Sequence, residues 1–146
     1  SYGSPAYYAQ VMFSSLHGDE ILATDSQNLP TRTWPRRGRG GAPGSAQQIK
    51  DVFFCATRDS QSGVIYLKVV NTSGSARPIT IQVRGASKVG PEGEVVTLAG
   101  KSLDDTNSIQ DPKRVVPRTE LVAGLSASFT REFPAYSVTV MKLQTK

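Results

Sequence analysis

Short apolar runs that alternate with a period of two residues dominate this chain after residue 50, and they constrain its fold more than any other feature. Residues 64–70 and 78–83 each place three aliphatic side chains on one face, and turns rich in Gly, Ser and Asn separate them. Seven or eight such strands are expected, in the regions 19–24, 53–58, 64–70, 78–83, 94–98, 125–129 and 136–140. Short strands with frequent turns predict an all-β fold, a β-sandwich or jelly roll.

One short helix is expected before these strands, over residues 5–16. Ser4 can act as a hydroxyl N-cap, and Pro5 stands at the first helical position. Apolar side chains then recur at helical spacing at Tyr8, Val11, Met12 and Leu16. Gly18 is a suitable stop. A helix this short is marginal alone, so its apolar stripe is expected to pack on a partner.

Composition excludes several kinds of site. The 146 residues contain one cysteine, Cys55, and one histidine, His17. No internal disulfide, zinc site or Cys–His nucleophilic pair can be built from them, and no cofactor or metal is expected. Cys55 lies in the apolar run 52–56 and is interpreted as a small buried hydrophobic residue. No apolar run is long enough to span a membrane, and no segment has the pattern of a signal peptide. Cytoplasmic and secreted locations both stay open.

Residues 25–48 form the most unusual segment, because Pro and Gly break every period there. It is expected to be a long loop without regular structure. Residues 25–50 hold five cationic side chains and one acidic one, so they carry +4 of the net charge of +5. Trp34 within it can stack on a sugar or a base, while Arg32 and Arg36 donate to hydroxyls or phosphates. The favoured alternative is that Trp34 anchors the loop on the core and the arginines are solvated; nucleic acid is not an expected partner.

Two further motifs have both a functional and a structural interpretation. Asp104, Asp105, Asn107 and Asp111 offer oxygen ligands of the kind that Ca²⁺ prefers, without the spacing of a calcium loop. Local hydrogen bonding in turns explains the same residues and is favoured. The tripeptide at 71–73, Asn-Thr-Ser, fits the pattern of an N-glycosylation acceptor, although it falls in a predicted hairpin turn.

Several weak motifs occur in a fixed order along the chain. They include SPAYYAQVMFS at 4–14, ATRD at 56–59, GVIYLKVVN at 63–71, PITI at 78–81, Asn107-Ser108, Asp111-Pro112 and PAYSV at 134–138. Together they resemble the C-terminal β-sandwich domain of family 51 α-L-arabinofuranosidases. The Arg/Gly-rich segment 27–48 departs from that pattern.

The resemblance implies a division of the polypeptide. Residues 1–17 would form a helix that connects to a preceding catalytic (β/α)₈ barrel, and residues 18–146 would form the sandwich. Members of the family are retaining glycosidases that use two glutamates on strands of the barrel, with carboxyl groups about 5 Å apart. A barrel requires about 250 residues, so this chain cannot contain one. None of its glutamates lies in a segment that resembles the catalytic motifs; they are Glu20, Glu92, Glu94, Glu120 and Glu132.

The chain itself is therefore expected to be inactive and to hold no catalytic residue. Its parent is expected to be an α-L-arabinofuranosidase acting on arabinose-containing polysaccharides, in which this domain stabilises the barrel and helps to shape its cleft. Self-association, or association with the barrel, is expected through the apolar stripe at 5–16. The alternative is a free-standing carbohydrate-binding module for arabinoxylan or arabinan. Such modules expose several aromatic rings, whereas most aromatic residues here, other than Trp34, are expected to face inward.

Overall fold

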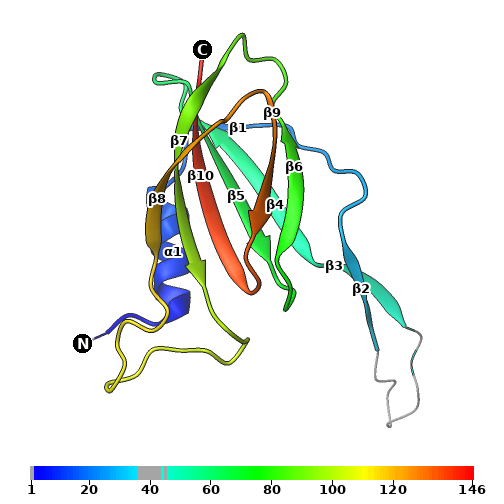
Figure 1. Ribbon diagram of the computed structural model, residues 1–146, viewed down its shortest axis with the longest axis vertical. Coiled ribbons are helices and arrows are strands. Elements are labelled where there is room, and N and C mark those ends of the chain that lie inside the picture. The colour runs from blue at the N-terminus through cyan, green and yellow to red at the C-terminus, as the bar shows by residue number, and fades with distance from the viewer. Residues whose placement is uncertain (1, 36–43, 45) are drawn as a thin grey trace.

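The computed structural model describes residues 2–35, 44 and 46–146, and it is a two-layered β-structure with one helix (Figure 1). The main layer is a six-stranded antiparallel sheet in the order β1-β4-β5-β10-β7-β8. Its strands are β1 (Glu20–Ile21), β4 (Val52–Arg58), β5 (Val64–Asn71), β10 (Ser137–Thr145), β7 (Val89–Ala99) and β8 (Arg118–Ala123). The second layer is the pair β6 (Arg77–Gln82) and β9 (Ser128–Phe133). The prediction of an all-β, sandwich-like fold with a short helix is confirmed.

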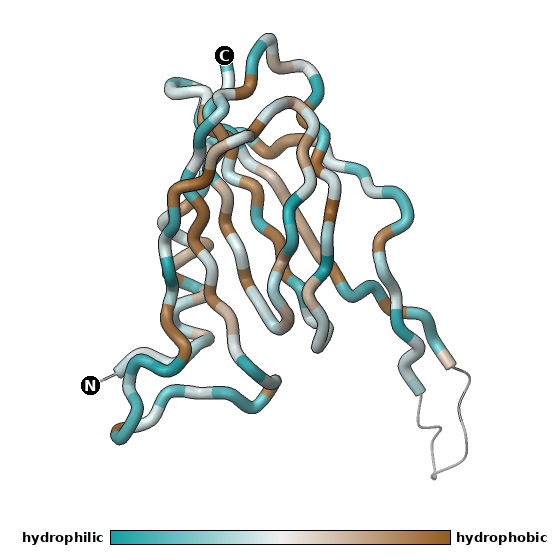
Figure 2. Tube along the Cα trace, in the orientation of Figure 1, coloured by the Kyte–Doolittle hydropathy of each residue, from teal (hydrophilic) through white to brown (hydrophobic). Residues whose placement is uncertain are grey.

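The main core lies between these two layers. Every second side chain of β5, from Ile65 to Val69, points into it, as the period-two pattern predicted. Phe133 of β9 is fully buried there, and Ile79 and Ile81 of β6 pack from the same side. Apolar and polar residues alternate along the strands in Figure 2, as expected where one face of each strand meets the core.

Helix α1 (Pro5–Ser15) packs on the other face of the main sheet, against β7 and β10. The hydroxyl of Ser4 accepts a hydrogen bond from the backbone N–H of Tyr7 at 3.1 Å, so the predicted N-cap is present. Met12 is only 3% exposed, and a second cluster of apolar residues surrounds it: Val96, Leu98, Val115 and Val140. The apolar stripe that is expected to mediate association is therefore covered in large part by the sheet of this chain. Tyr8, Met12 and Leu16 pack on the sheet, and Val11 stays exposed.

Gly18 lies where the chain passes from α1 to the edge of the sheet. A β-carbon at this position would lie 2.1 Å from the carbonyl carbon of Arg58, so only glycine fits without a shift of the backbone. The backbone N–H of Gly18 also donates to the hydroxyl of Thr57 at 2.9 Å. Gly18 thus lets the helix connection lie directly on β4.

Three sequence-based expectations differ from the structure. The segment 25–48 is not without regular structure, because β2 (Thr31–Trp34) pairs with β3 (Gln47–Lys50) as an antiparallel ribbon. Strand β8 was not expected. Cys55 is exposed rather than buried, because it points to the face of β4 that the helix leaves uncovered. Within the described part of the chain, no helix has the length and apolar character needed to cross a membrane.

Candidate contact sites

The β2–β3 ribbon carries the residues that the sequence suggests for ligand contact. It projects away from the two layers (Figure 1), with Thr31 opposite Lys50 and Trp34 opposite Gln47. The Trp34 side chain is 54% exposed. The guanidinium carbon of Arg32 lies 5.7 Å from the centre of the Trp34 ring, within the range of a cation–π contact. The third candidate, Arg36, lies outside the described residues.

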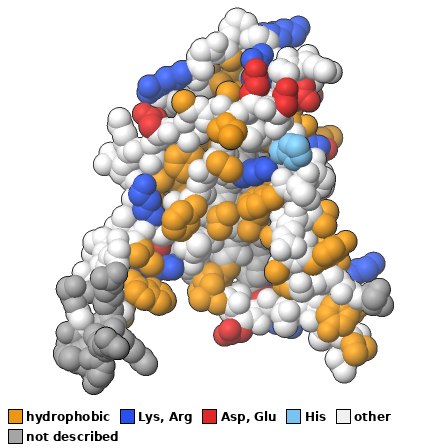
Figure 3. All heavy atoms as spheres, turned by 180° about the vertical axis from the view of Figure 1, so that it is seen from behind, with side chains coloured by type: hydrophobic (Ala, Val, Ile, Leu, Met, Phe, Trp, Pro, Cys, Tyr) orange, Lys and Arg blue, Asp and Glu red, His pale blue; other side chains and the backbone are white. Residues whose placement is uncertain are grey.

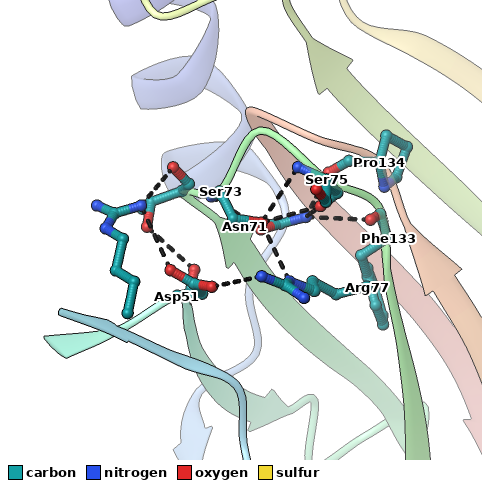
Figure 4. Close-up of polar contacts among 9 residues, drawn as sticks. Asp51, Asn71, Ser73, Ser75, Arg77, Phe133 and Pro134 are labelled. Atoms are coloured by element: carbon teal, nitrogen blue, oxygen red, sulfur yellow. Dashed lines mark hydrogen bonds and ion pairs between the residues drawn. The ribbon is translucent and has the colours of Figure 1, made fainter. Parts of the chain in front are cut away.

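Arg32 also faces inward, toward a buried carboxylate. Its Nη1 donates to the carbonyl oxygen of Thr72 at 3.0 Å and lies 3.4 Å from Oδ1 of Asp51. Asp51 is 1% exposed and stands at the junction of β3 and β4. Its Oδ2 accepts a hydrogen bond from Nη2 of Arg77 at 2.7 Å (Figure 4). Arg32 therefore joins the ribbon to the sandwich, whatever else its exposed part contacts.

The backbone of Asp51 strengthens this junction. Its N–H donates to the carbonyl oxygen of Pro30 at 2.9 Å, and its carbonyl oxygen accepts from the backbone N–H of Thr72 at 2.8 Å. The hydroxyl of Thr72 donates to the same carbonyl oxygen at 3.1 Å. Asp51 thus contacts the start of the ribbon, the β5–β6 turn and β6. This residue was missed in the sequence, where an isolated aspartate just before an apolar run gives no signal.

Asn71 has a structural role in the turn that follows β5. The residue is 1% exposed, and its side-chain nitrogen lies within hydrogen-bond distance of the carbonyl oxygens of Ser75, Phe133 and Pro134, at 2.9, 3.2 and 2.8 Å. Its Oδ1 accepts from the backbone N–H and the hydroxyl of Ser73 (Figure 4). An amide so fully engaged is not accessible to a glycan, so the glycosylation interpretation of residues 71–73 is wrong.

The loop between β7 and β8 is held by its own polar side chains. Asp105 accepts from the backbone N–H of Lys101 at 2.9 Å and pairs with Arg114. Both contacts keep the pKa of the Asp105 carboxyl below its usual value, and the hydrogen bond from Lys101 has a larger effect than the one from Arg114. The Asn107 side chain bonds both backbone groups of Val115 and the carbonyl oxygen of Gly3. Among the described residues no group of three or more His, Cys, Asp or Glu could hold a metal ion.

The glutamates are dispersed over the strands. Glu20 pairs with Arg58, Glu120 pairs with Arg131, and Glu132 is exposed. Glu92 and Glu94 line a shallow open groove of about 450 Å³, where Glu94 lies 2.5 Å from Nζ of Lys142. Glu92 is exposed and Glu94 is ion-paired, so neither carboxylate lies in enclosed apolar surroundings.

Comparisons with known proteins agree with this arrangement of strands. A family model described as the α-L-arabinofuranosidase C-terminal domain matches residues 1–137. An extracellular exo-α-L-arabinofuranosidase of Streptomyces chartreusis is 34% identical over 90 residues, which are 62% of this chain and 10% of that protein. The arabinose-bound structure of the MgGH51 α-L-arabinofuranosidase superposes with a TM-score of 0.77 and 27% identity, over 99% of this chain and 20% of that one. The Thermotoga petrophila enzyme shares the fold, with a TM-score of 0.77 and 21% identity over 95% of this chain and 28% of its own.

The class that the fold defines is a β-sandwich domain of the kind found in α-L-arabinofuranosidase structures. The chain belongs to the family of α-L-arabinofuranosidase C-terminal domains, because the family model covers nearly all of it. It spans about one tenth of the curated relative and one fifth of the MgGH51 chain.

Proposed function

We propose that this chain is the non-catalytic sandwich domain of a retaining α-L-arabinofuranosidase that acts on arabinose-containing polysaccharides. In this proposal the domain stabilises a catalytic (β/α)₈ barrel in the same polypeptide and contributes to the edge of its cleft. The observation that carries the proposal is the family match over residues 1–137, together with a fold shared at a TM-score of 0.77 with an arabinose-bound enzyme. The dispersed, partly ion-paired glutamates support a non-catalytic role.

The 146-residue chain is expected to release no 4-nitrophenol from 4-nitrophenyl α-L-arabinofuranoside. The physical reason is that Glu92 is exposed and Glu94 is ion-paired with Lys142 in a shallow open groove, whereas retaining hydrolysis needs an acid and a free nucleophile that face each other across the scissile bond. Activity should be measured after repeated purification, with Glu92→Gln and Glu94→Gln variants as controls. Hydrolysis that survives purification and disappears in either variant would show that this chain is itself an enzyme.

The ribbon is the part of the domain that we propose for saccharide contact, through Trp34, Arg32 and Arg36. In the longer polypeptide, Trp34→Ala is expected to lower kcat/KM for polymeric substrate several-fold, about 1 kcal/mol, because a flat ring that stacks on a sugar is lost. The melting temperature should change little, since Trp34 is 54% exposed. A lower melting temperature with unchanged kinetics would assign Trp34 to anchoring instead.

A free-standing carbohydrate-binding module is the second candidate, and the exposed Trp34 with Arg32 beside it is the observation that favours it. Calorimetric titration of the 146-residue chain with arabino-oligosaccharides separates the two. Weak or absent binding is expected, because one ring on a projecting ribbon provides no enclosed pocket. Micromolar affinity that Trp34→Ala abolishes would favour the binding module.

A further inference from the structure

Several apolar side chains of the described chain are exposed on the face of the main sheet that carries α1. On the helix, Tyr7, Val11 and Phe13 are 55, 42 and 37% exposed. On β4, Phe53 is 52% exposed, and Cys55 is exposed beside it. Figure 3 views the molecule from behind and shows hydrophobic side chains gathered across this face. These five residues are called the rear surface below.

The sheet register makes the rear surface continuous from β4 to the helix. Phe53 lies opposite Val70 of β5, and Cys55 lies opposite Lys68. Nζ of Lys68 donates to the carbonyl oxygen of Phe13 at 3.0 Å and lies 5.1 Å from the centre of the Phe13 ring. Lys68 therefore connects the β4 part of the surface to the α1 part.

The side chains of this area are more typical of a surface that another protein domain covers than of one that faces water. Lys68 is 8% exposed, and its ammonium group contacts a carbonyl oxygen and an aromatic ring rather than bulk water. The five residues of the rear surface carry no charge. Exposed apolar side chains that gather around a buried, internally bonded lysine mark a site of protein contact.

The polypeptide enters the domain at this surface. Residues 2–4 lead directly into the first turn of α1 (Figure 1). The matched family is described as a C-terminal domain, and this chain covers only 20% of the MgGH51 chain. In such a polypeptide the preceding part arrives beside Tyr7 and Val11. The covalent link therefore keeps it near the rear surface at a high effective concentration.

We propose that the rear surface is the docking surface for the domain that precedes this one in the same polypeptide. The inference rests on the proposed function and names the residues through which that function stabilises the barrel. The partner is expected to present an uncharged apolar surface, since only such a surface covers Phe53 and Val11 without burying an unpaired charge. A second copy of the chain is the competing occupant.

Cys55 provides a direct probe, because it is the single cysteine in the sequence and belongs to the rear surface. Its alkylation by iodoacetamide should be followed by peptide mass mapping in the 146-residue chain and in the longer polypeptide. The rate is expected to be at least ten-fold lower in the longer polypeptide. A Thr80→Cys variant, on the exposed side of β6, is the matched control and should react equally in both.

Substitution of a surface residue gives an independent test. Val11→Asp in the longer polypeptide should restore alkylation of Cys55, whereas Leu103→Asp, at a residue 77% exposed in the β7–β8 loop, should not. Equal Cys55 rates in the two unmodified proteins would overturn the inference. Protection that depends on concentration in the 146-residue chain would overturn it in favour of a second copy.

Arabinofuranosidase activity of the longer polypeptide, measured in the same samples, keeps the two proposals apart. An active polypeptide with a reactive Cys55 contradicts the docking surface and leaves the proposed function intact. An inactive polypeptide with a protected Cys55 contradicts the proposed function and supports the docking surface.

Discussion

Replacing Phe133 by alanine is expected to lower the free energy of unfolding of this chain by about 3–5 kcal/mol. Phe133 is fully buried at the end of β9, in the cluster that joins the two layers. The second layer contains two strands, so few neighbouring side chains can move to fill the cavity. Urea unfolding followed by circular dichroism measures the change.

Phe53→Ala is the matched control, because it removes the same atoms from a side chain that is 52% exposed. It should cost less than about 1 kcal/mol in the 146-residue chain. If Phe133→Ala does not fold, Phe133→Leu should still unfold at lower urea concentration, with a loss of about 1–1.5 kcal/mol. Similar losses for Phe133→Ala and Phe53→Ala would show that the two layers do not form the main core.

The strands that could be predicted from the sequence are those in which one face is buried and the other is not. In β5 and β6, the alternation of aliphatic and polar residues follows directly from this asymmetry, and the strand bounds were nearly correct. Strand β8, from Arg118 to Ala123, was missed because most of its side chains are exposed. It is defined by hydrogen bonds to β7 at the edge of the sheet, and an exposed edge strand leaves little hydrophobic signal.

Turn geometry explains a smaller error near the C-terminus. The alternation of Tyr136, Val138 and Val140 suggested that the last strand includes Tyr136. The structure gives Tyr136 a φ of 47°, in the left-handed region, and β10 begins at Ser137. A non-glycine residue with such a φ is uncommon, so sequence patterns do not predict it. The backbone N–H of Tyr136 donates to the carbonyl oxygen of Ser73 at 3.0 Å, a contact between distant segments.

The candidate sites could be predicted only in part, for a related reason. Trp34 and Arg32 are conspicuous in the sequence, and the structure places them side by side on the β2–β3 ribbon, while their contact with a ligand stays a prediction. The β4 part of the rear surface was not identified, because Phe53 and Cys55 lie in an apolar run that is typical of a buried strand. Whether a neighbour covers both faces of β4 is decided by tertiary packing, and α1 covers β7 and β10 rather than β4. Asp51 escaped notice because its partners, Arg32 and Arg77, are 19 and 26 residues away in the sequence.

Asp51→Asn is expected to have the largest effect among the polar residues of the described chain, with a loss of about 2–3 kcal/mol in the free energy of unfolding. The carboxylate is 1% exposed, and its removal leaves Arg32 and Arg77 without their anionic partner. The side chains of these arginines are 36% and 32% exposed, so water offsets part of the loss. Thermal and urea unfolding measure this change.

The same substitution should also loosen the β2–β3 ribbon, and Trp34 reports this directly as the single tryptophan of the chain. Its fluorescence anisotropy is expected to fall in Asp51→Asn, because the contact of Arg32 with Asp51 helps to fix the ribbon on the sandwich. Arg77→Gln is the matched comparison: it breaks the second ion pair of Asp51 and leaves Arg32 in place. It should lower stability while leaving the anisotropy of Trp34 nearly unchanged. Equal anisotropy in the unmodified chain and in Asp51→Asn, under conditions where both are folded, would show that the ribbon is held by other contacts.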